Sequence, residues 1–138
     1  MSKSGIDAVP IGASAQITKT VSESDVYLYA GITGDFSPNH VNEQYMREGR
    51  YGRRIAHGTL LMGFMSAASA RLQLGRTVSL GYDRVRFPAP VFLGDTITTV
   101  YTIREVNREK RRVIADVRCT NQRGEVVGAA VNIRAFVD

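Results

Sequence analysis

The stretch from Gly58 to Ala70 constrains the fold more than any other part of the chain, because it carries no charged residue. Apolar side chains recur along it at the three- and four-residue spacing of a helix, and the remaining positions are mostly small. The apolar positions are Leu60, Leu61, Phe64, Met65, Ala68 and Leu72. A helix with an apolar face and no charge on its other faces is expected to be buried nearly all round. We therefore predict a buried helix over Gly58–Leu74 that ends at Gly75 and packs against a sheet.

Four long segments beyond this helix alternate apolar and polar residues and are rich in β-branched side chains, as half-buried strands are. Turn residues separate them at Pro88–Pro90 with Gly94-Asp95, at Asn107–Lys110 and at Gln122–Gly124. Another segment with strand character lies near the amino terminus. The predicted strands are Ile11–Val21, Thr77–Phe87, Thr96–Val106, Arg111–Asn121 and Glu125–Val137.

The segment between the first strand and the buried helix is expected to be helical and rich in loops. Ser22 offers an N-cap and Asp25 stands three residues on, which is a variant of the capping box that starts a helix. Gly31 and Gly34 mark the end of this short helix. Asn42–Met46 is predicted to form one more helical turn, and Arg47–Ile55 an exposed loop.

These elements predict an α+β fold in which an antiparallel sheet curves around a long central helix. A chain of 138 residues with 43% hydrophobic and 22% charged residues is expected to form one globular domain over residues 1–138. The edge strands of such a sheet need cover, and pairing with a second copy of the chain supplies it. We therefore expect a homodimer.

Charge, cysteine and histidine content narrow the possible functions. The net charge of +5 comes mostly from arginines scattered along strands, which is typical of a solvated face and not of the dense basic stripe of a nucleic-acid binder. Arginine binds phosphate well, so an anionic small molecule is the better partner. Cys119 is the only cysteine, which excludes an intrachain disulfide, and its place in a strand indicates a buried, inert thiol. His40 and His57 are the only histidines and no Cys/His cluster exists, so we expect no metal.

Two further properties bear on location. The first ten residues lack the apolar segment of a signal peptide. The longest uncharged apolar run, residues 58–70, is too short to span a bilayer. We expect a cytoplasmic protein without a membrane partner.

The segment Gly31–His40 places a carboxylate and an imidazole five residues apart, where two glycines and a proline break regular structure. A helix cannot run through Pro38, so we expect Asp35 and His40 on a bent loop that aims both side chains at one point. An ionised Asp accepts hydrogen bonds and a His donates or accepts them near neutral pH, so the pair is suited to holding and activating one water. The alternative is an ordinary turn in which Asp35 caps backbone N–H groups.

Three motifs resemble, in the same order, those of the MaoC-like (R)-specific enoyl-CoA hydratases, which have the hot-dog fold. They are T-G-D-F-S-P-N-H at 33–40, A-H-G at 56–58 and F-P-A-P-V-F-L-G-D at 87–95. The resemblance implies reversible addition of water to a trans-2-enoyl-CoA to give an (R)-3-hydroxyacyl-CoA, with no cofactor beyond the CoA of the substrate. Asp35 and His40 would be the catalytic pair, and which of them delivers the α proton stays open. The enolate oxygen needs a donor, a role that falls to the N–H of Gly58 at the amino end of the buried helix.

Ser37, Asn39 and His57 are candidates for substrate binding. Ser37 stands where the family commonly has Asn, and Asn39 where it commonly has an apolar residue. A polar Asn39 beside His40 would favour a short or polar acyl chain. His57 is expected to be a residue at the start of the helix with a satisfied imidazole, and a catalytic role is its alternative.

Arg53 and Arg54 complete the candidate binding residues. Together with Arg50 they form a tight basic group in the loop before the buried helix. A solvated loop is the expected structure, and contact with CoA phosphates is the alternative.

Two other functions remain open for a chain of this pattern. Thioester hydrolysis would use an Asp as base or nucleophile but does not require His40 at its spacing from Asp35. A non-catalytic protein that binds acyl thioesters would keep the fold and lose the chemistry.

Overall fold

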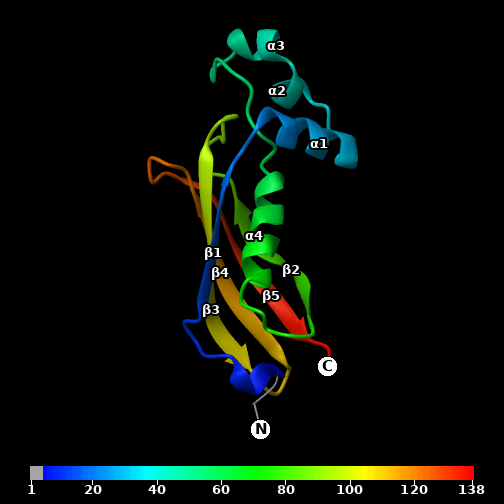
Figure 1. The fold of residues 1–138 in the computed structure, drawn as a ribbon, viewed down its shortest axis with the longest axis vertical. Helices are drawn as coiled ribbons and strands as arrows, with labels where there is room; N and C mark the ends of the chain where they lie inside the picture. Colours follow the sequence, from blue (N-terminus) through cyan, green and yellow to red (C-terminus); the bar gives the residue numbers. More distant parts are fainter. Residues whose placement is uncertain (1–4) are drawn as a thin grey trace.

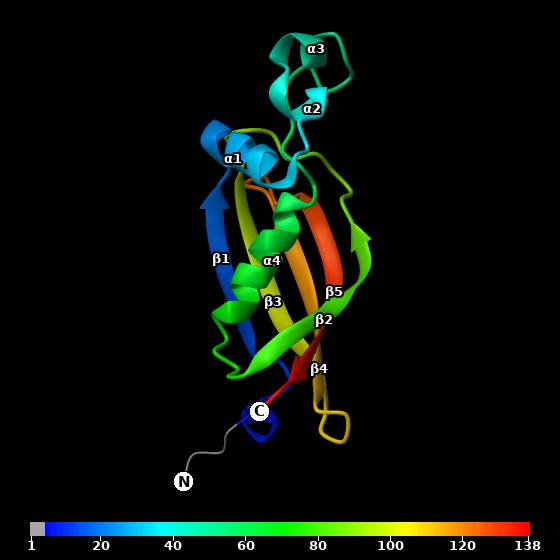
Figure 2. The ribbon, with the colours of Figure 1, turned by 90° about the vertical axis from the view of Figure 1, so that its right-hand side faces the viewer.

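A five-stranded antiparallel sheet curves around one central helix, α4 (Leu60–Ala70), in the computed structural model of the protein, which describes residues 5–138 (Figures 1 and 2). The strand order is β1-β3-β4-β5-β2. The strands are β1 (Ser14–Thr20), β2 (Thr77–Arg86), β3 (Thr96–Asn107), β4 (Arg112–Thr120) and β5 (Val126–Phe136). The last four begin and end within one residue of their predicted bounds, which confirms the predicted sheet.

The core lies between the concave face of the sheet and α4. Alternate residues of β3 and β4 are buried, as the two-residue period of a strand requires. Leu61 and Met65 of α4 are at most 1% exposed, and burying each stabilises the fold by about 1.5–3 kcal/mol. Cys119 is also fully buried, as predicted, and burial raises the pKa of its thiol.

α4 is shorter and less covered than predicted. It ends at Ala70, and Gln73 has a left-handed backbone with a φ of 52°. The sheet lies on one side of the helix, as Figure 2 shows, so its opposite side is exposed in the single chain. The exposed residues on that side are Gly63, Ser66, Ala67 and Ala70. The prediction that α4 is buried nearly all round is wrong for the single chain. Small uncharged residues on one side of a helix do not by themselves ensure that another element packs against that side.

The segment between β1 and α4 forms three short helices beyond one end of the sheet (Figure 1): α1 (Glu23–Thr33), α2 (Pro38–Val41) and α3 (Glu43–Arg47). Ser22 and Asp25 exchange the two hydrogen bonds of a capping box, as predicted. The expectation of an irregular loop around Pro38 is wrong. A proline is tolerated in the first turn of a helix, and Pro38 begins α2. A 3₁₀ helix, η1 (Gly5–Ala8), precedes β1.

No helix in the described part of the chain combines the length and the apolar composition needed to cross a lipid bilayer.

Candidate active site

The chain leaves α1 through Gly34, whose left-handed backbone, with a φ of 83°, turns the next residue away from the helix axis. Asp35 follows, and its carboxylate is fixed by one neighbour. Its Oδ1 accepts hydrogen bonds from the backbone N–H of Ser37 at 3.1 Å and from the Ser37 hydroxyl at 2.5 Å. These two bonds lower the pKa of Asp35, since they stabilise the ionised form. Asp35 is therefore a carboxylate at neutral pH with its second oxygen free.

His40 lies in α2 and is 9% exposed. Its Nδ1 is 2.8 Å from the carbonyl oxygen of Ile55. A carbonyl only accepts hydrogen bonds, so Nδ1 carries the proton and Nε2 of the neutral ring keeps a free lone pair. This Nε2 is 3.8 Å from Oδ2 of Asp35, too far for a direct hydrogen bond. Both atoms can instead contact one water oxygen at about 2.8 Å from each.

His57 packs directly against this pair. Its ring stacks on His40 with centroids 3.7 Å apart, and the Tyr29 ring packs against it at an inclination of 62° with centroids 4.7 Å apart. Its Nε2 lies 2.9 Å from the carbonyl oxygen of Asp35, so Nε2 is the donor nitrogen. Nδ1 is buried and has no partner among residues 5–138. The prediction of a satisfied imidazole is thus wrong for one of its two nitrogens.

Asp35, His40 and His57 are also the residues of the described chain that could hold a metal ion. Each offers one ligand atom, and these atoms lie within 4.8 Å of one another. Two of the four ring nitrogens already donate to backbone carbonyls, so a metal that used either would have to displace that bond. The expectation of no metal stays a prediction.

Gly58 follows His57 and precedes α4. Within residues 5–138 its N–H has no hydrogen-bond acceptor, so the donor is available to a bound molecule. A Cβ at this position would lie 2.8 Å from the ring of Phe87, which explains why the backbone needs a glycine here. Gly58 also lines an apolar cavity of about 220 Å³, together with Leu61, Phe87 and Val127.

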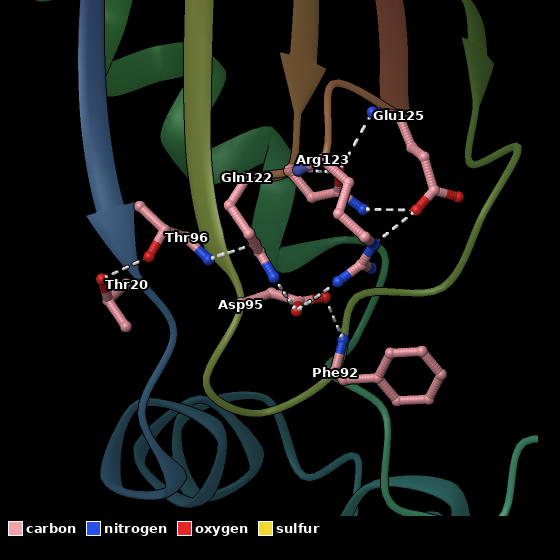
Figure 3. Close-up of polar contacts among 8 residues, drawn as sticks. Thr20, Phe92, Asp95, Thr96, Gln122, Arg123 and Glu125 are labelled. Carbon is pink, nitrogen blue, oxygen red and sulfur yellow. Dashed lines mark hydrogen bonds and ion pairs between the residues drawn. The ribbon is translucent and has the colours of Figure 1, made fainter.

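The loop between β2 and β3 supports the segment that carries His57 and Gly58. Ala56 donates its N–H to Val91 at 2.7 Å, and Ile55 forms a β-bridge with Phe92. The loop is held in turn by Asp95, which is 4% exposed (Figure 3).

Asp95 accepts hydrogen bonds from the N–H of Phe92 and from the side chain of Gln122, each at 2.9 Å. The Gln122 side chain also accepts the N–H of Thr96 at 2.9 Å, which ties the hairpin between β4 and β5 to the same point. Asp95 was predicted only as part of a turn, and this support was not predicted. The sequence does show a carboxylate between a glycine and a predicted strand. It does not reveal the partner of that carboxylate, because Gln122 is distant in sequence.

The arginines before α4 have different surroundings. Arg53 is exposed and its guanidinium lies 3.9 Å from the ring centroid of Phe92. Arg54 instead forms ion pairs with Glu43 at 2.6 Å and Glu23 at 2.7 Å, and its side chain is 16% exposed. These bonds raise the pKa of Arg54 further above its usual range. The expectation of a solvated side chain is wrong for Arg54, because α1 and α3 bring two carboxylates within reach of one guanidinium.

Asn39 directly precedes His40 in α2, but it faces a different part of the surface. It lines a separate hollow of about 380 Å³ with Tyr45, Arg50 and Tyr51, and only its carbonyl oxygen, which accepts the N–H of Ile55 at 3.0 Å, bonds toward the site. The structure thus brings Asp35, Ser37, His40 and His57 together, leaves Gly58 next to them in the chain, and separates Asn39 from them.

Comparison with known proteins identifies the family. Residues 9–125 match the family model described as a MaoC like domain. The chain is 41% identical over 109 residues, 79% of its length, to the (R)-specific enoyl-CoA hydratase of Rhodospirillum rubrum, of which it covers 76%. It is 33% identical over 117 residues, 85% of its length, to the 3-hydroxybutyryl-CoA dehydratase of Methylorubrum extorquens, of which it covers 73%.

A solved structure supports the same family assignment. R-hydratase PhaJ1 from Pseudomonas aeruginosa superposes with a TM-score of 0.85 at 32% identity, over 97% of this chain and 86% of the other. The predicted hot-dog fold is confirmed by this match and by the sheet topology. The chain belongs to the MaoC-like dehydratase family.

Proposed function

We propose that the protein is a hydratase/dehydratase, a lyase that adds water reversibly to a trans-2-enoyl-CoA to give an (R)-3-hydroxyacyl-CoA. The observation that carries the proposal is the 3.8 Å separation between Oδ2 of Asp35 and Nε2 of His40, each with a free lone pair. The names of the two sequence relatives, a hydratase and a dehydratase, support the same reaction in its two directions.

The catalytic pair acts as a proton relay. A water held by Asp35 and His40 gives one proton to the pair as its oxygen attacks the β carbon of the enoyl thioester, and the pair returns a proton to the α carbon. The thioester oxygen gains negative charge in between, and the unpaired N–H of Gly58 stabilises it. The bond changes add one water across the double bond with no change of oxidation state overall, so the reaction needs no redox cofactor.

The remaining candidate residues bind the substrate or position the catalytic pair. His57 and Ser37 hold the carboxylate loop through the bonds described above. The apolar cavity beside Gly58 receives the acyl chain, and its small size suits a short one. Arg53 has no carboxylate partner among the described residues and is the better candidate for a CoA phosphate, whereas Arg54 is neutralised by two glutamates.

The exposed small-residue side of α4 and the edge strand β2 provide the surfaces for a homodimer.

Crotonyl-CoA tests the proposal. Addition of water removes the conjugated double bond, so ultraviolet absorbance of the enoyl thioester should fall when the protein is added and fall about 100-fold more slowly with Asp35→Asn. A thiol reagent in a parallel reaction reports free CoA, the product of a thioesterase. A folded protein that leaves short, branched and long enoyl-CoAs unchanged would refute the proposal.

A further inference from the structure

The outer face of the sheet, opposite α4, carries a hollow of about 580 Å³ that no residue of the candidate active site lines. Ala129 and Val131 of β5 contribute to it between longer side chains from the neighbouring strands. Arg84 and Arg86 come from β2, on one side of β5, and Arg118 comes from β4, on the other. A volume of this size lies within the range of small-molecule sites.

A β-bulge places two of these arginines on the same face. Asp83 pairs with Val131 and Arg86 pairs with Ala129, so three steps along β2 match two steps along β5. The additional residue breaks the alternation, and Arg84 has a left-handed backbone with a φ of 53°. Bulges commonly redirect side chains, and here the result is that both Arg84 and Arg86 line the hollow.

The strand register sets the distance across the hollow. Arg118 pairs with Ala129, and Ala129 pairs with Arg86, so the three residues form one row across β4, β5 and β2. Neighbouring strands lie about 4.8 Å apart, which puts the two arginine backbones about 10 Å from each other. The methyl group of Ala129 is too short to fill the space between two arginine side chains.

The guanidinium groups of Arg84, Arg86 and Arg118 have no ion-pair or hydrogen-bond partner among residues 5–138. One carboxylate, Asp116, also lines the hollow, but it pairs with Arg104 at 2.9 Å. The neighbouring Asp83 does not line it. The hollow therefore carries a clear excess of positive charge that the protein itself does not neutralise.

We propose that this hollow is an anion-binding site for a diphosphate group. Guanidinium forks from both sides can bind the oxygens of two linked phosphates, because each fork presents two parallel N–H donors. The apolar surface of Ala129 and Val131 accommodates the organic part of the ligand. A diphosphate ester can be the nucleotide end of the CoA substrate, an option that rests on the proposed function, or a free nucleotide.

Pyrophosphate titration followed by calorimetry tests the site without any turnover. Saturable binding is expected for the wild-type protein, weakened about tenfold by Arg86→Gln and again by Arg118→Gln, since each removes charge-assisted hydrogen bonds. Arg112→Gln is the matched control, because it removes an exposed arginine from β4 outside the hollow and should change the affinity by less than about twofold. Absence of saturable binding, or equal weakening by Arg112→Gln, would overturn the proposal.

Two further titrations distinguish the sources of the diphosphate. If the CoA nucleotide is the ligand, CoA binding weakens and the KM for the enoyl-CoA rises in Arg118→Gln, with kcat unchanged. If a free nucleotide is the ligand, ATP binding weakens in this variant while the KM for the enoyl-CoA stays constant. Pyrophosphate binding with no effect of the variant on either CoA or ATP would overturn the assignment to a diphosphate ester. Because pyrophosphate binding needs no catalysis, an inactive protein that still binds it would refute only the proposed hydratase.

Discussion

The ring of His57 lies flat against the ring of His40, with centroids 3.7 Å apart and planes inclined by 26°. Each ring donates one N–H to a backbone carbonyl, His40 to Ile55 and His57 to Asp35. The carbonyl partners thereby fix the tautomer of both rings. The second bond also joins the segment before α4 to the loop that carries Asp35, which makes His57 a positioning residue in the proposed reaction.

Two variants of His57 separate its contacts. His57→Phe keeps a stacked ring and removes the donor to Asp35, whereas His57→Gln keeps an N–H donor at similar reach. We expect His57→Phe to lower kcat by about tenfold to a hundredfold, because small misplacements of a catalytic group have effects of this size, and His57→Gln to recover most of the loss.

Thermal unfolding of the same variants distinguishes positioning from simple damage. The lost hydrogen bond contributes about 0.5–1.5 kcal/mol, but the unpaired, buried Nδ1 costs about 1–3 kcal/mol, so His57→Phe should leave the free energy of unfolding unchanged or raise it. A wild-type kcat in His57→Phe would contradict the positioning role.

Removal of either catalytic group should abolish most of the activity. Asp35→Asn and His40→Gln are each expected to lower kcat on an enoyl-CoA by about 100-fold or more, which is the lower end for loss of acid or base assistance. Asp83→Asn is the control, because it removes an exposed carboxylate on β2 outside the site. Circular dichroism should show all three variants folded, and near-normal turnover in either catalytic variant would exclude the relay.

Ser37 is expected to keep the Asp35 carboxylate ionised to low pH. Its two hydrogen bonds lower the pKa of Asp35, so the ionised carboxylate stabilises the folded protein above the ordinary Asp pKa of about 3.9, and this contribution is lost as the pH falls through the lowered value. Ser37→Ala removes the hydroxyl donor, so the pKa of Asp35 should rise, and NMR titration of its carboxyl carbon measures that rise.

Thr33→Val is the control for this effect. The Thr33 hydroxyl accepts the N–H of Asp35 at 3.2 Å and does not contact the carboxylate, so its removal should leave the pKa of Asp35 unchanged. Equal pKa shifts in Ser37→Ala and Thr33→Val would show that loop disorder, and not loss of the bond to the carboxylate, raises the pKa of Asp35.

Local patterns predicted the strands and the proximity of Asp35 and His40, because the relevant information is close in sequence. Alternation and turn residues locate the ends of β2 to β5, and Asp35 and His40 lie within one loop and the helix that follows it. The groups that fix the two imidazole rings could not be predicted, because they are backbone carbonyls brought in by the fold. The same limit applies to the arginines of the outer hollow, which come from two strands and depend on a β-bulge.

Helix α4 shows a different limit. Its sequence carries the apolar face that packs on the sheet, but the absence of charge on the other side does not reveal whether a partner covers it. The end of the helix was also misplaced, because Leu72 continues the apolar spacing after the helical hydrogen bonds have ended.

Gly58 should not tolerate even a methyl group without loss of activity. The Cβ of Gly58→Ala would lie 2.8 Å from Phe87, so either the ring or the backbone N–H must move. We expect kcat to fall by about tenfold or more, the effect of losing one oxyanion donor being about 10²–10³. Gly58→Ala combined with Phe87→Ala should recover part of kcat relative to Gly58→Ala alone, since the clash is then removed. Additive losses in the double variant would show that the two residues act independently.

Arg53 and Arg54 should differ in what their loss changes, although they are adjacent in sequence and carry the same charge. Arg54→Met leaves Glu23 and Glu43 without their shared cation, and we expect the free energy of unfolding to fall by about 1–2 kcal/mol, a value reduced for partial exposure. Arg53→Met removes a cation that lies over Phe92 and has no carboxylate partner in the described chain, so stability should change by less than about 1 kcal/mol while the KM for a CoA thioester rises. Thermal unfolding and steady-state kinetics on the two variants check both expectations. A KM increase in Arg54→Met with an unchanged melting temperature would reverse the assignment and place the CoA phosphate at Arg54.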